Sequence, residues 1–211
     1  MAYDLEEQEQ IDAIKGWWSD YGNYVMLAAI ACLLTIAGFQ GWRYYKAQQS
    51  ERASSLFSQL DQAERTGEPK KVRDIAARIM DKHASTHYAG MAALSAAKAS
   101  FSIGELEDAK TNLQWVIDKG REDEMRDVAR LRLAGILLDE KKYDEALKVL
   151  STTSSDAYVP LYADLKGDVL TAQGKPAEAR AAYQLALDKS ESTSQYRALI
   201  ELKLDALGDA K

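Results

Sequence analysis

A run of 22 residues without a charged side chain, from Tyr21 to Trp42, constrains the fold of this chain most strongly. About 20 helical residues, each rising roughly 1.5 Å, cross the ~30 Å hydrocarbon core of a bilayer. A helix buried inside a soluble protein is the alternative, but such helices are usually amphipathic, whereas this run is apolar on every side. The run therefore predicts a transmembrane helix, which we place at residues 23–45.

Aromatic residues flank this run on both sides, as they do at the two interfaces of a membrane. Three of the four tryptophans lie there, namely Trp17, Trp18 and Trp42. The preceding segment, residues 1–22, contains six acidic residues and one basic residue. A cleaved signal peptide begins with basic residues, so we expect this helix to remain as an anchor.

The anchor leaves its orientation and its packing open. Lys15 precedes it and Arg43, Lys46 and Arg52 follow it, so the positive-inside rule taken literally places the C-terminal part in the cytoplasm. Long domains cross the membrane largely regardless of nearby charge, so the count does not decide the topology. Ala37 and Gly41 form a small-residue pair four positions apart, which suits either close packing of a second transmembrane helix or contact with lipid.

The chain beyond the anchor, residues 46–211, has the pattern of consecutive helices. Neither Gly nor Pro occurs from Lys46 to Thr66, so the anchor helix is predicted to continue into a soluble helix. Gly67 and Pro69 then end this helix and begin the next. The apolar face of the continuation comprises Ala53, Leu56, Phe57, Leu60 and Ala63.

A sequence unit recurs three times in this region, with a weaker copy beginning at Gly67. Each clear copy has a turn, a small residue and then a large apolar residue four positions on. The small residues, 37 and 33 positions apart, are Ala109, Ala146 and Ala179. Two helices approach closely only where a small side chain lies at their crossing, so we assign these alanines to helix crossings.

This unit resembles the tetratricopeptide repeat, a pair of antiparallel helices of about 34 residues. The resemblance is incomplete, because the first helices lack the usual tryptophan and Lys142 takes the place of the turn glycine. The prediction is an all-α chain, in which an N-terminal transmembrane helix precedes a tetratricopeptide-like α-solenoid of helical hairpins. An irregular helical bundle with accidental spacing is the alternative.

Several kinds of chemistry are not expected from this sequence. After residue 22 the chain has 26 basic and 27 acidic residues, so it lacks the positive charge that nucleic acid requires. No phosphate-binding loop, nucleophile elbow or zinc-type cysteine pair occurs. His83 and His87 suit a metal pair on one helix or, as we prefer, solvated turn residues. We expect no enzyme activity, catalytic residue, metal or cofactor.

The order of segments resembles a known family. An acidic start from Leu5 to Lys15 is followed by Trp17-Trp18, one membrane span, the sequence Gly41-Trp42-Arg43-Tyr44 and then the repeats. This arrangement is similar to that of the ancillary subunit of the SecYEG translocon in Gram-negative bacteria. The resemblance extends over essentially the whole chain, and its N-terminal block is the more specific part.

This resemblance implies an inner-membrane protein with a cytoplasmic N-terminus at residues 1–22 and a periplasmic repeat domain. It also implies partners: the SecYEG translocon, a membrane-anchored periplasmic chaperone of the prolyl-isomerase class, and unfolded secreted chains leaving the channel. We expect a docking module, with Tyr88, Tyr158 and Tyr162 as candidate contacts or, alternatively, as core residues. A self-associating envelope scaffold for division or outer-membrane assembly is the alternative function.

Overall fold

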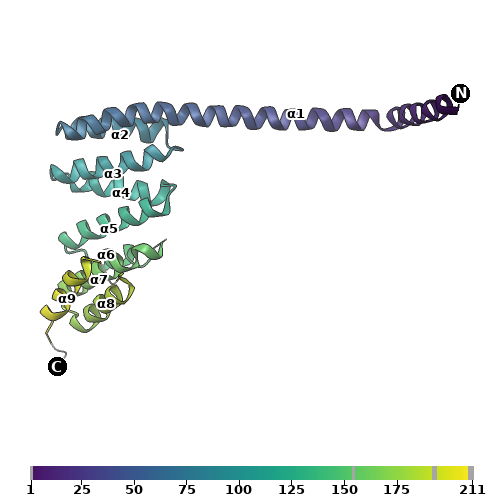
Figure 1. Cartoon of the computed structure of the whole chain (residues 1–211). Helices are drawn as coiled ribbons and strands as arrows, with labels where there is room; N and C mark the ends of the chain where they lie inside the picture. Colours follow the sequence, from purple (N-terminus) through teal and green to yellow (C-terminus); the bar gives the residue numbers. More distant parts are fainter. Residues whose placement is uncertain (1, 154, 192–193, 209–211) are drawn as a thin grey trace. The chain divides into compact units, whose positions relative to one another are not determined.

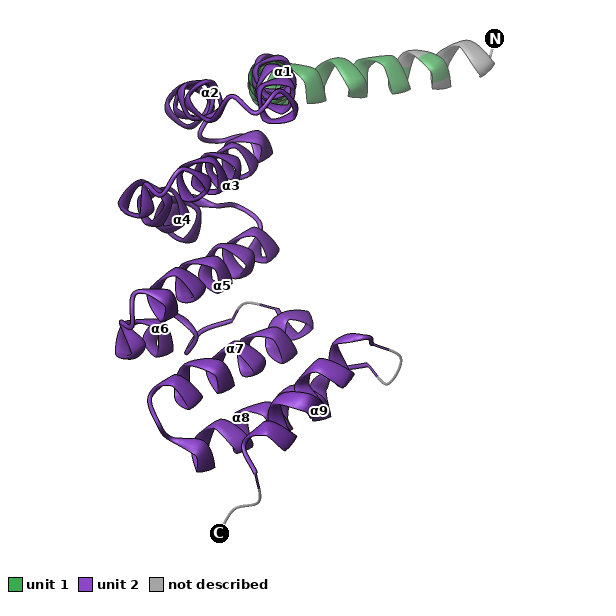
Figure 2. Ribbon diagram, turned by 90° about the vertical axis from the view of Figure 1, so that its left-hand side faces the viewer, with its two compact units in different colours: residues 1–49 green, residues 50–211 purple. Residues whose placement is uncertain are grey.

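The computed structural model describes residues 2–153, 155–191 and 194–208, which are helical and contain no β-strand (Figure 1). This confirms the all-α prediction. The chain divides into two compact units, residues 1–49 and 50–211 (Figure 2). Of the predicted acidic segment, residue 1 and the side chains of residues 2–6 and 8 lie outside the described part.

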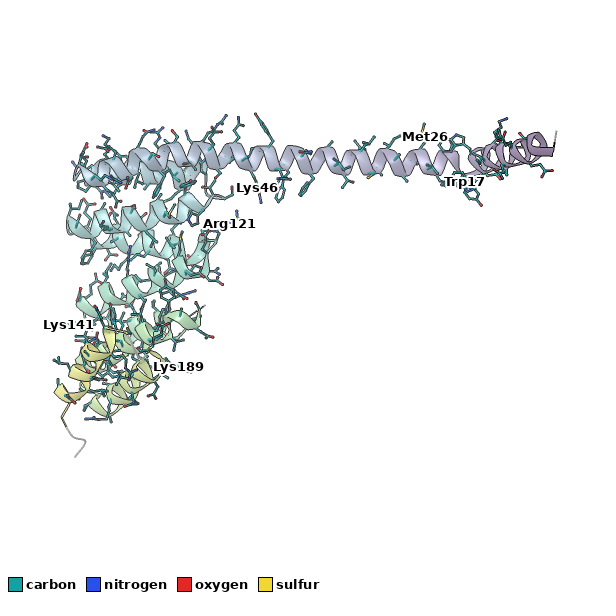
Figure 3. All side chains as sticks on the ribbon, in the orientation of Figure 1. Trp17, Met26, Lys46, Arg121, Lys141 and Lys189 are labelled. Carbon is teal, nitrogen blue, oxygen red and sulfur yellow. The ribbon has the colours of Figure 1, made fainter. Side chains whose placement is uncertain are left out.

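Helix α1 (Ala2–Arg65) continues without interruption past the predicted segment boundaries at 22/23 and 45/46. Within residues 1–49, the large apolar side chains from Ile11 to Tyr45 are exposed, and Figure 3 shows Trp17, Met26 and Lys46 extending away from the helix axis. By length and composition this helix is able to cross a membrane, and none of its apolar window is buried by protein. Exposure of this many apolar side chains to water is unfavourable, whereas contact with lipid would remove them from water.

The second unit is a series of antiparallel helical pairs stacked in chain order (Figure 2). Residues 50–65 of α1 pack with α2 around a shared apolar cluster, and the next pairs are α3 with α4, α5 with α6, and α7 with α8. The bounds are α2 Pro69–Lys82, α3 His87–Ser102, α4 Leu106–Lys119, α5 Asp123–Asp139, α6 Tyr143–Val149, η1 Asp156–Tyr158, α7 Val159–Ala172, α8 Pro176–Lys189 and α9 Tyr196–Ala206.

The turns inside these pairs are built alike. In each, one residue with positive φ ends the first helix, and the next residue's N–H reaches back five positions to a helix carbonyl, the Schellman arrangement. The residues with positive φ are Gly67, Gly104, Lys141 and Gly174, with φ between 62° and 82°. In the third turn the prediction named Lys142, which is wrong by one position: Lys142 has φ −86°.

The interior of the unit is a chain of three apolar clusters, each shared by neighbouring pairs. The first joins residues 50–65 of α1 with α2 and α3, the second extends from α3 to α7, and the third joins α7, α8 and α9. Along the predicted face of the α1 continuation, Ala53, Leu60 and Ala63 are fully buried, as the spacing predicted. Each pair thus buries its apolar face against its neighbours, as in a solenoid.

Candidate docking surfaces

The apolar part of α1 carries two features at its C-terminal end. The Lys46 ammonium lies 3.7 Å from the centre of the Trp42 ring, and the Arg43 guanidinium lies 5.8 Å from that of Phe39. Ala37 and Gly41 are both exposed, and a Cβ added at Gly41 would meet nothing within 4 Å. A cation beside an aromatic ring suits the membrane interface, and the small-residue pair remains open to a second helix or to lipid.

The three repeat alanines, Ala109, Ala146 and Ala179, are completely buried on α4, α6 and α8. Their burial fits the assigned helix crossings, which remain a prediction. At the α7–α8 pair, a Cβ added at Gly167 would lie 2.4 Å from the Tyr183 ring, so these two helices approach closely there. Ala182, three positions after Ala179 on α8, is also buried, at 7% exposed.

The three candidate contact tyrosines lie in different surroundings. Tyr88 is half-buried beside Phe57, with 5.6 Å between ring centres, and Tyr158 is half-buried against the central cluster. Tyr162 is 4% exposed, so its assignment as a partner contact is wrong. Its ring fills the core, and its hydroxyl donates a hydrogen bond to Asp127 at 3.0 Å. Burial, reinforced by this hydrogen bond to a carboxylate, raises the pKa of Tyr162.

A fully buried carboxylate, Asp127 on α5, was missed by the sequence interpretation. It accepts hydrogen bonds from the Tyr162 hydroxyl, from the Arg130 guanidinium at 3.0 Å and from the Ser155 backbone N–H at 3.0 Å. Position 127 lies four residues before Leu131, on the apolar stripe of its helix, and that placement was the available signal. Through its hydrogen bond with Ser155, the carboxylate holds the loop after α6 against α5, so we assign Asp127 a structural role.

A partly buried ionic cluster connects the last helix, α9, to α7. Lys203 on α9 donates to Asp164 at 2.8 Å and to Asp168 at 2.9 Å, both on α7. Burial of the ammonium lowers the pKa of Lys203, but hydrogen bonds to the two carboxylates outweigh it and the net shift is upward. Burial disfavours the charged form of Asp164 as well, which raises the pKa of this carboxyl group, although the hydrogen bond from Lys203 acts in the opposite direction. These groups are satisfied by one another, so we assign them to stability.

The two histidines differ in their exposure. His83 ends α2 and is buried, so the expectation of a solvated turn residue is wrong for it. His87 is exposed at the start of α3, and its Nδ1 lies 2.8 Å from a Glu122 carboxylate oxygen. Among the described residues, no group of three or more His, Cys, Asp or Glu side chains is arranged to hold a metal ion.

Grooves lie between successive helices of the stack, and two of them involve the central pairs. A groove of about 970 Å³, with charged and apolar lining, lies between the second helices α4 and α6. The other, about 410 Å³ and mainly apolar, lies between the first helices α3 and α5, and we call it the α3–α5 groove. Its lining residues are Ala97, Lys98, Phe101, Leu113, Arg132, Gly135, Ile136 and Asp139. Grooves of this size between helices suit the binding of a peptide or helix.

Comparison with known proteins gives a consistent result. The family model for the tetratricopeptide repeat-like domain matches residues 15–209. An ancillary SecYEG translocon subunit of Neisseria gonorrhoeae is 30% identical over 208 residues, covering 98% of this chain and all of the relative. This chain belongs to the ancillary SecYEG translocon subunit family. A family member from Escherichia coli is 28% identical over 204 residues, covering 95% of this chain and 96% of the relative.

The family assignment agrees with the fold. The solved structure of the MamA RS-1 ArsTM double mutant superposes with a TM-score of 0.55 at 17% identity, covering 75% of this chain and 96% of that one. At this identity the likeness concerns the fold alone. Ancillary translocon subunits and tetratricopeptide repeat-like domains are non-catalytic kinds of families, which agrees with the absence of catalytic motifs in the sequence.

Proposed function

We propose that this protein is a non-enzymatic, membrane-anchored docking subunit associated with the SecYEG translocon. One observation carries the proposal: a chain that matches ancillary SecYEG subunits over nearly its full length combines, among its described residues, one uncovered apolar helix with a stack of helical hairpins. The helix would hold the protein in the inner membrane. The hairpins would present grooves to a periplasmic chaperone of the prolyl-isomerase class and to secreted chains.

Association with the translocon is tested by affinity purification of the full chain from detergent-solubilised membranes, with SecY measured in the eluate. We propose that the face with Ala37 and Gly41 packs against a translocon helix, so Gly41→Leu should reduce recovered SecY several-fold. Ala28→Leu is the matched control, because it places the same leucine side chain about 140° away around the helix. Absence of SecY from the wild-type eluate would refute the function, and equal recovery with both variants would refute the packing face.

The proposed topology has residues 1–22 in the cytoplasm and the hairpins in the periplasm. Cys32→Ser removes the native thiol, after which single cysteines replace Ala13 or Ala177, both of which are exposed. A membrane-impermeant maleimide should label position 177 in intact spheroplasts and position 13 only after permeabilisation. The opposite labelling would place the hairpins in the cytoplasm and overturn the orientation.

A second candidate function is a self-associating envelope scaffold, and the last helix provides an observation in its favour. Terminal helices of solenoids usually have a polar outer face, but α9 exposes Tyr196, Leu199 and Leu202. Cross-linking in native membranes separates the two functions. Products containing SecYEG subunits support the docking function, whereas homo-oligomers alone support the scaffold.

A further inference from the structure

The α3–α5 groove is an open apolar hollow on the first-helix side of the stack. Leu113 and Ile136, which are buried, form its floor, and the small residues Ala97 and Gly135 leave space above them. A Cβ added at Gly135 would meet nothing within 4 Å. Phe101, which also lines the groove, is 50% exposed. The hollow therefore has apolar surface available for a partner.

The two ends of this groove differ in charge. Helices α3 and α5 run in the same direction, because α4 returns between them. Lys98 precedes Phe101 on α3, and Arg132 precedes Ile136 on α5, so two cations lie towards one end of the hollow. Asp139 follows Ile136 and lies towards the other. Lys98 is 73% exposed and its nearest acid, Glu64, is 3.7 Å away, so this ion pair is weak and the cationic end remains available.

The chemistry of the groove identifies its occupant. We propose that the α3–α5 groove binds a protein segment that presents large apolar side chains next to an acidic residue, with the carboxylate at Lys98 and Arg132. A fatty acid offers the same two groups, but its apolar end would then face Asp139, where a peptide can place a polar group. The segment is the better match. This proposal rests on the docking function and adds the chemistry of the partner.

The probes are two fluorescein-labelled peptides of 12 residues that differ only in charge. Both carry Phe-Leu-Phe within a Gly/Ser sequence, preceded by Asp-Asp in one and by Lys-Lys in the other. Anisotropy is measured with the full chain in lipid nanodiscs, and empty nanodiscs give the blank. The acidic peptide should bind at least tenfold more tightly at low salt, and added salt should narrow the difference. The double variant Lys98→Glu, Arg132→Glu should reverse the preference.

Filling the groove provides the second test. Gly135→Leu places a side chain in open space and improves helix propensity, so it should block the peptide without unfolding the protein. We expect at least a tenfold loss of affinity with an unchanged circular dichroism spectrum and unfolding midpoint. Ala181→Leu, at an exposed position of α8 outside the groove, is the matched control and should bind normally.

Three results would overturn the groove assignment: equal affinity for the two peptides, full binding by Gly135→Leu, or binding of oleate at this site without binding of either peptide. Recovery of SecY with the wild-type chain is measured separately. If SecY is recovered but the peptides fail, only the groove proposal falls. If the peptides behave as expected but SecY is absent, the translocon association falls and the groove remains.

Discussion

The turn between α5 and α6 provides a direct test of the repeat geometry. Lys141 has φ 62°, whereas the same position in the other three turns is glycine. A residue with a Cβ in this conformation is strained by about 1–2 kcal/mol, and glycine removes that strain. Glycine also makes the unfolded chain more flexible, which lowers the free energy of unfolding by about 0.5–1 kcal/mol. Lys141→Gly should therefore stabilise the second unit by about 0.5–1 kcal/mol, measured by urea unfolding of residues 50–211 followed by circular dichroism.

Lys142→Gly is the control for this substitution, because it changes the adjacent lysine at φ −86°, where glycine relieves no strain. It should leave stability unchanged or lower it by up to about 1 kcal/mol. Gly104→Ala tests the reverse change and should destabilise by about 0.5–1 kcal/mol, since glycine there has φ 82° and the same offset from the unfolded chain applies. If Lys142→Gly stabilises the unit and Lys141→Gly does not, the turn is misplaced by one residue and the reasoning fails.

Three further substitutions test the interior of the second unit by the same urea assay. Ala146→Leu should cost about 1–3 kcal/mol through overpacking, whereas Ala181→Leu, at an exposed position, should cost almost nothing; equal stability of the two would remove the crossing assignment. Tyr162→Phe should cost about 1.5–3 kcal/mol, because it removes a hydrogen bond to the buried Asp127 carboxylate, and a neutral effect would show that the bond is unimportant. Lys203→Met tests pH dependence: despite burial, the folded-state pKa of this lysine is raised above its ordinary value by hydrogen bonds to Asp164 and Asp168, so its contribution is complete below the ordinary pKa and is lost as the pH rises through the folded-state pKa. As the pH is raised through the alkaline range, the wild type should lose more stability than the variant, and parallel losses would contradict the ionic role.

The groove illustrates how much of the candidate site was accessible from the sequence. Its residues come from three helices, and neither Phe101 nor Gly135 belongs to a sequence motif. They line one groove only because of the distance at which α3 and α5 pack in the folded chain. For Tyr162 the sequence offered a candidate residue but did not determine its burial. Tyr162 matches an exposed aromatic as well as a buried one by spacing alone, and only its position against Asp127 decides between them.

The sequence by itself determined the uncharged membrane-length run, the all-helical class and the repeat with its small residues. Those depend on local composition and spacing, which act within one helix or one turn. Tertiary structure decided which faces are buried. A solenoid helix touches neighbours on both sides, so its buried arc is wider than one apolar stripe, and Ala182 is enclosed beside Ala179. Desolvation and hydrogen bonding at Asp127 likewise depend on residues far away along the chain, which no local pattern specifies.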